Sequence, residues 1–273
     1  MIANYTLPIS ISYKRSIQAL WYAKWFVFPV LPVLMAIFVF DKTSQRLAFG
    51  LLCWVLLFAL HAWEASKRRQ FVRESVLPRY IAGKLREKYP HLTLSDTDLV
   101  MRGLRQFFIT YLRSGKQFVA MPSQVVDAAW HEFILHTRGY ESWCGVAFGK
   151  LLHHSPAEVL GKSATRNDGL RRAWYWACKE ESINPRAPTR LPLLFALDKK
   201  LNIPGGFTYV PDCKDINSKS GSDSYCGSDF GNSGGGSGDS GGFGGSESSG
   251  SSGGSDGGSD SSGCGGGCGG GGD

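Results

Sequence analysis

The residues with the greatest capacity for chemistry lie close together, in the range 121–156 of the 273-residue chain. Imidazole, thiol and carboxylate groups serve as metal ligands and as acid–base catalysts in proteins. This range holds four of the six histidines of the chain, with one cysteine and one aspartate: His131, His136, His153, His154, Cys144 and Asp127. We therefore expect any metal binding or catalysis to centre here.

Asp127 and His131 are four residues apart, so on a helix they lie on the same face. The carboxylate can then accept a hydrogen bond from an imidazole N–H and fix its tautomer, an arrangement that metal ligands and general bases use. His136 follows His131 by five residues, and the pair therefore lacks the H-E-x-x-H spacing that places two histidines on one helix face. A zinc protease of that type is excluded.

Three interpretations of these residues remain open. His131, Cys144 and His153 or His154 could meet between helices and bind zinc or iron, because thiolate and imidazole suit such metals. Alternatively, Cys144 could be a nucleophile, with His131 as its base and Asp127 orienting that base. The third interpretation is that these side chains are core and capping residues without a ligand.

One pattern in this range is specific enough for comparison with a known family. Its elements are Val126-Asp127-x-x-Trp130-His131, His136, Tyr140, Cys144, Phe148-Gly149 and His153-His154-x-Pro156. Further elements are Leu191-Pro192-x-Leu194-Phe195-x-Leu197-Asp198 and Gly206-Phe207-x-Tyr209. This pattern resembles the glycine-rich domain-containing protein family (GRDP-like), in its bacterial branch. The resemblance covers residues 120–213 and implies a domain without an established activity.

The elements that position these residues are predicted to be mostly helical. Caps, stop signals and apolar spacing indicate helices near residues 99–112, 124–137, 140–152, 168–182 and 191–201. The only strand signal is residues 206–210. Trp174 and Trp176 could stack nucleic-acid bases, but their helical spacing favours core packing, and Arg171 and Arg172 are expected on a solvated face.

Two apolar runs precede this helical part. Residues 19–40 and 47–63 are each long enough to span a bilayer, and a six-residue loop joins them. Basic residues flank the pair on both outer sides, so the positive-inside rule places both termini in the cytoplasm. A cleaved signal peptide is disfavoured because a second apolar run follows the first. We expect an integral membrane protein, in the inner or plasma membrane if the source is bacterial.

Composition separates the end of the chain from the rest. Residues 214–273 contain 24 of the 35 glycines and carry a net charge of −6, against +7 for the whole chain. Such a segment is expected to be disordered. Seven scattered cysteines fit a reduced compartment rather than a disulfide framework, so Cys213 and Cys226 are expected to stay unpaired. Cys264 and Cys268 form at most half of a metal site.

The predicted organisation is mostly α. Residues 1–18 form an N-terminal cytoplasmic segment, 19–63 a transmembrane hairpin, 64–213 a small helical GRDP-like domain, and 214–273 a disordered tail. We expect a binding or scaffolding module with a metal centre. The alternative is a metal-assisted hydrolase that uses His131, Asp127, Cys144 and His153. The expected partners are the lipid bilayer and a protein bound by the helical domain or the tail, and nucleic acid is disfavoured.

Overall fold

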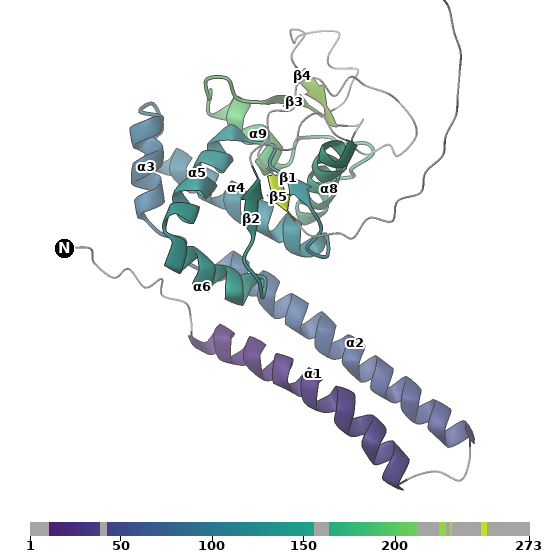
Figure 1. Ribbon diagram of the computed structural model, residues 1–273. Helices are drawn as coiled ribbons and strands as arrows, with labels where there is room; N and C mark the ends of the chain where they lie inside the picture. Colours follow the sequence, from purple (N-terminus) through teal and green to yellow (C-terminus); the bar gives the residue numbers. More distant parts are fainter. Residues whose placement is uncertain are drawn as a thin grey trace, which may run out of the picture.

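The fold is mostly helical, as expected from the sequence (Figure 1). A computed structural model describes residues 11–38, 43–155, 164–211, 224–227, 230 and 247–249. The helices are α1 (Ile11–Phe38), α2 (Thr43–Glu74), α3 (Tyr80–Lys88), α4 (Leu94–Arg113), α5 (Gln124–Leu135), α6 (Thr137–Ala147), α8 (Ala164–Glu180) and α9 (Leu193–Lys200). The strands are β1 (Val119–Ala120), β2 (His153–Ser155), β3 (Thr208–Val210), β4 (Ser224–Cys226) and β5 (Glu247–Ser249).

Helices α1 and α2 lie side by side and extend away from the rest of the molecule (Figure 1). Among the described residues, one helix, Leu47–Glu74, is long and apolar enough to cross a membrane. Only 6% of its most apolar window is buried within the chain, whereas the core helix of a soluble protein is mostly buried. A second span is not supported, because no other described helix meets the same test. Residues 39–42, at the end of the first predicted span, lie outside the described part.

Helix α4 is the centre of the body, and α2, α3, α5, α8 and α9 all pack against it. It begins five residues earlier than the sequence predicted. The reason is a capping box, in which the Thr93 hydroxyl accepts from the Asp96 backbone N–H and the Asp96 carboxylate accepts from that of Thr93. Gly103 allows its close packing, since an added Cβ would lie 2.4 Å from a Leu197 methyl group.

Aromatic side chains fill the core between α4, α5 and α6. The rings of Phe108 and Trp143 have centroids 4.8 Å apart, and those of Phe107 and Trp130 are 5.0 Å apart. These side chains are at most 1% exposed. Trp174 of α8 is also fully buried, as the preference for core packing predicted, whereas Trp176 is only partly buried.

The second half of the histidine-rich range differs from the prediction. Helix α6 begins at Thr137 and ends at Ala147, where the sequence predicted a helix over residues 140–152. Gly149 has a φ of 79° and its backbone N–H donates to Cys144 and Gly145, which closes the helix end. The chain then forms β2 in place of another helical turn.

Two small sheets include segments of the predicted disordered tail. In the first, β5 pairs antiparallel with both β1 and β2, and in the second, β4 pairs parallel with β3. Apart from Gly227 and Phe230, β4 and β5 are the described part of the predicted disordered tail, and the rest of residues 214–273 lies outside the described residues. The expectation that Cys226 stays unpaired is wrong, since this residue is disulfide-bonded. Pairing of β4 with β3 buries Cys226, which composition alone did not indicate. Cys213, Cys264 and Cys268 lie outside the described residues.

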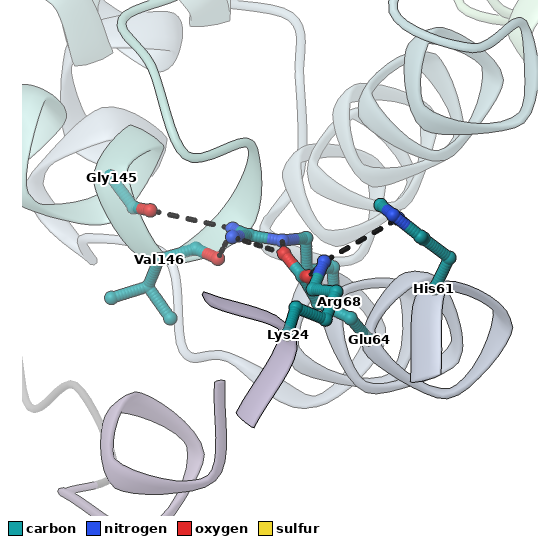
Figure 2. Close-up of polar contacts among 6 residues, drawn as sticks. All are labelled: Lys24, His61, Glu64, Arg68, Gly145 and Val146. Carbon is teal, nitrogen blue, oxygen red and sulfur yellow. Dashed lines mark hydrogen bonds and ion pairs between the residues drawn. The ribbon is translucent and has the colours of Figure 1, made fainter. Parts of the chain in front are cut away.

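A polar cluster joins the two long helices to the body (Figure 2). We call it the hairpin junction; its residues are Lys24, His61, Glu64, Arg68, Gly145 and Val146. Lys24 of α1 pairs with Glu64 of α2, and Arg68 Nε donates to the same carboxylate over 2.8 Å. The Arg68 guanidinium also donates to the Val146 carbonyl at 2.6 Å, at the C-terminal end of α6. This one buried side chain therefore connects α2 with α6.

Candidate metal centre

The N-terminus of α5 is fixed by two side chains. The Ser123 hydroxyl accepts from the Val126 backbone N–H at 3.3 Å and forms the N-cap that the sequence predicted near this position. Asp198, from the last turn of α9, accepts from the Ser123 hydroxyl at 2.7 Å and from the Gln124 backbone N–H at 2.8 Å. A carboxylate at the start of a helix is also favoured by the helix dipole. The position of Asp127, in the first turn of α5, is therefore well determined.

Asp198 is a buried structural residue rather than a candidate for catalysis. Its side chain accepts two further hydrogen bonds, from the backbone N–H groups of Val125 and Phe207. The residue is 2% exposed, so this carboxylate is held by four donors away from solvent. In the sequence it stood out only within the family pattern. Asp198 is a single aspartate in a short helix, and Ser123, which it contacts, lies 75 residues earlier in the sequence. No local pattern therefore predicts this hydrogen bond.

Asp127, His131 and His154 converge on one point. Asp127 Oδ2 lies 3.3 Å from His131 Nδ1, and Asp127 Oδ1 lies 3.1 Å from His154 Nε2. One ligand atom from each residue can be chosen so that all three lie within 4.8 Å of one another. We call these three residues the Asp–His–His group. The predicted Asp127–His131 spacing on α5 thus gives the expected pair, and β2 adds the third member.

The two histidines of the group differ in exposure. The His131 side chain is 50% exposed, whereas that of His154 is 8% exposed. The His154 ring packs against the indole of Trp130, with ring centroids 4.7 Å apart, and against His131 at 4.3 Å. Burial lowers the pKa of the His131 imidazole below its usual value, against the opposing effect of the Asp127 carboxylate. One side of the group is therefore packed on the core and the other side faces solvent.

A chain of hydrogen bonds holds the segment just before His154. The Trp130 indole N–H donates to the Tyr140 hydroxyl at 3.0 Å, and that hydroxyl donates to the Leu152 carbonyl at 2.6 Å. These bonds tie α5 and α6 to the residues just before β2. They fix where β2 begins, and thereby where His154 meets α5.

Cys144 lies apart from the Asp–His–His group, although the sequence placed it among the candidate ligands and nucleophiles. Its side chain is fully buried on α6. Burial raises the pKa of the Cys144 thiol to about 11, with partial opposition from hydrogen bonds to Leu152 and Tyr140. Reactive cysteines are exposed and have a lowered pKa. The environment of Cys144 is that of a core thiol.

The remaining histidines of the range also lie outside the group. His153 is exposed, because successive side chains of a strand point in opposite directions and His154 takes the inner side. His136 connects α5 to α6, with its ring 5.9 Å from that of Tyr80 and close against Gly139. The structure thus brings His131 and His154 together, and separates His136 and His153 from them.

The group has the donor set of a transition-metal site. Two imidazole nitrogens and one carboxylate oxygen suit zinc, and also iron in its divalent state. In catalytic zinc sites, three protein ligands leave a fourth position for water or substrate. The exposed side of His131 is where such a position would open to solvent.

Comparison with known proteins places the chain in a family. A family model described as UCP032817-like matches residues 67–230, which is more than half of the chain. The match gives no support to the resemblance to glycine-rich domain-containing proteins. No curated protein and no solved structure matches the chain.

Proposed function

The chain belongs to the UCP032817-like family, and we propose that its helical domain is a membrane-tethered binding module built around a divalent metal ion. The ligands are Asp127, His131 and His154. Zinc is the preferred ion and iron the second candidate, as the chemistry of two imidazoles and a carboxylate suggests. The matched family description states no activity, so the proposal rests on the residues of this chain.

The observation that carries the proposal is the convergence of three donors from separate elements. Asp127 and His131 come from α5, and His154 comes from β2, which follows α6 in the chain. A merely structural Asp–His pair needs one histidine, whereas here a single carboxylate lies within 3.3 Å of two imidazoles. A cation bound between them would use all three donor groups.

The membrane part of the proposal rests on the long helices. The apolar part of α2 is almost wholly exposed, and α1 packs beside it. Contiguous apolar surface of this extent marks a membrane or partner contact. We infer that the pair lies in the bilayer. Of the basic residues at the end of α2, Arg68 and Arg73 bind groups of the body.

A metal-assisted hydrolase is the second candidate. It is favoured by one observation, the half-exposed His131 at the edge of the group. An ion bound there would keep a coordination position for water, and a bound metal ion makes water acidic enough to attack a substrate at neutral pH. In this version Asp127 and His154 hold the ion, and Cys144 has no role in the reaction.

Elemental analysis of the full chain, purified in detergent, tests the metal proposal. We expect about one equivalent of zinc or iron, and loss of that metal in His131→Ala and in His154→Ala. His153→Ala is the matched control, because His153 is the exposed neighbour in the same strand. Circular dichroism of each variant reports whether it is folded. Metal that persists in both folded ligand variants, or that is lost equally in His153→Ala, would refute the assignment.

A further inference from the structure

A second candidate site lies along the outer face of α8, on residues that the proposed metal centre does not use. It is an open groove of about 780 Å³, a volume within the usual range of ligand pockets. The residues that carry the argument are Arg171, Arg172, Tyr175, Trp176, Lys179 and Arg186. We call this site the α8 groove. From the sequence, Arg171 and Arg172 were expected on a solvated face and Trp176 in the core.

Helical spacing aligns cations and rings along the groove. Arg171, Tyr175 and Lys179 follow one another at intervals of four residues, so they form one row on α8. Arg172 and Trp176 form a parallel row. Lys179 lies over the Tyr175 ring, with its nitrogen 5.7 Å from the ring centroid. The groove therefore presents positive charge next to aromatic surface along its length.

The carboxylates at the end of α8 pair with cations outside the groove. Glu180 pairs with Arg73 and Arg113 on another side of α8, and Glu181 pairs with Arg190. Asp168 is the one acidic residue among those that line the groove. Within the described part of the chain, no acidic side chain forms an ion pair with Arg171, Lys179 or Arg186. An anion can therefore bind there without displacing an existing partner.

The rings limit the kind of anion that fits. Tyr175 is 44% exposed, a large fraction for an aromatic side chain, whereas its neighbour Trp174 is fully buried. An exposed ring beside a row of guanidinium groups suits a ligand with both a planar ring and phosphate oxygens, because arginine binds phosphate bidentately and bases stack on aromatic rings. A free anion or a lipid headgroup would use the cations and leave the ring unused.

We propose that the α8 groove binds a nucleotide. Arg171, Lys179 and Arg186 hold its phosphates, and Tyr175 stacks on its base. Arg172 contributes less, because one of its guanidinium nitrogens already donates to the Phe118 carbonyl. This site is independent of the proposed metal centre and does not require it.

Calorimetric titration of the full chain in detergent with ADP tests the proposal. We expect saturable binding that weakens by about tenfold or more in the double variant Arg171→Glu/Arg186→Glu, since each lost contact is a charge-assisted hydrogen bond that becomes repulsive. The matched control is Lys199→Glu/Lys200→Glu, an equal change of charge at two exposed lysines of α9. Binding should be unchanged in that control and in His154→Ala.

Pyrophosphate and an oligonucleotide separate the alternatives. Tyr175→Ala should weaken ADP binding and leave pyrophosphate binding unaltered. The proposal is overturned if ADP does not bind, or if the two double variants weaken it equally. It is also overturned if pyrophosphate binds as tightly as ADP, which would indicate a simple anion site. Binding of a single-stranded oligonucleotide without binding of ADP would point to a polymer and would equally overturn it.

Discussion

Tyr140 is the residue that links the aromatic core to the candidate ligand His154. Its hydroxyl accepts from the Trp130 indole and donates to the Leu152 carbonyl, and both bonds are buried. Loss of this hydroxyl leaves a donor and an acceptor without partners in the interior. The same loss frees the residues just before β2, which carries His154.

We expect Tyr140→Phe to lower the free energy of unfolding by about 1–3 kcal/mol, because unsatisfied buried polar groups are costly. It should also weaken metal binding, although no proposed ligand is removed. Denaturant unfolding and competition with a chelator measure the two effects.

Tyr111→Phe is the matched control for this variant. The Tyr111 hydroxyl is also buried but has no hydrogen-bond partner among the described residues. Its removal should leave stability unchanged or increase it. Equal destabilisation by the two substitutions would show that the Tyr140 bonds contribute nothing specific.

At the scale of elements, the start of α5 determines the geometry of the candidate centre. Asp198 of α9 caps this helix with a buried carboxylate, whereas Asp96 caps α4 at an exposed position. Both side chains accept from helix N-termini. Their surroundings differ, and this difference gives a direct comparison.

We expect Asp198→Ala to lower the free energy of unfolding by about 2–4 kcal/mol, since it leaves several buried N–H and O–H donors without an acceptor. Asp96→Ala should cost clearly less, because water replaces an exposed cap. Chemical unfolding of both variants in the same detergent checks the order. A smaller loss for Asp198→Ala than for Asp96→Ala would contradict the described capping of α5.

The elements also show what could be predicted from sequence. The start of α5 and the Asp127–His131 pair depend on local spacing and a local cap, and both were predicted. Strand β2 depends on pairing with β5, almost a hundred residues later, and no local pattern indicates it. The sequence suggested His154 as a ligand but did not predict strand β2. It therefore could not show which of His153 and His154 faces α5. Residue type alone could not show that Cys144 is buried.

On the scale of the whole molecule, the hairpin junction connects the two long helices to the body (Figure 2). Arg68 is buried and bridges Glu64 of α2 to the C-terminal carbonyls of α6. We expect Arg68→Ala to lower the free energy of unfolding by about 1.5–3 kcal/mol, since it removes charge-assisted hydrogen bonds to Glu64 and Val146 while Lys24 stays paired with Glu64.

The neighbouring Lys67→Ala is the control for this junction, because Lys67 is less buried and, within the described part of the chain, its side chain hydrogen-bonds only to Gln70. Thermal unfolding and limited proteolysis after α2 report the loss of attachment. If both variants behave like the unmodified chain, the junction does not hold the body to the hairpin.

The orientation in the membrane stays a prediction. Basic flanks predict that the body lies in the cytoplasm, where disulfides are rare, and yet Cys226 is disulfide-bonded. We expect a fluorescent protein fused to the C-terminus to be active in cells and an alkaline phosphatase fusion to be inactive. The reverse result would place the body in an oxidising compartment and would fit a permanent disulfide.

X-ray absorption spectroscopy of the metal-loaded chain tests the central claim most directly. Binding by Asp127, His131 and His154 predicts nitrogen and oxygen neighbours at about 2.0 Å, with the scattering signature of two imidazoles. Cys144 lies outside this group, so no sulfur neighbour is expected. A sulfur shell at about 2.3 Å, or a spectrum without imidazole, would contradict the proposed centre.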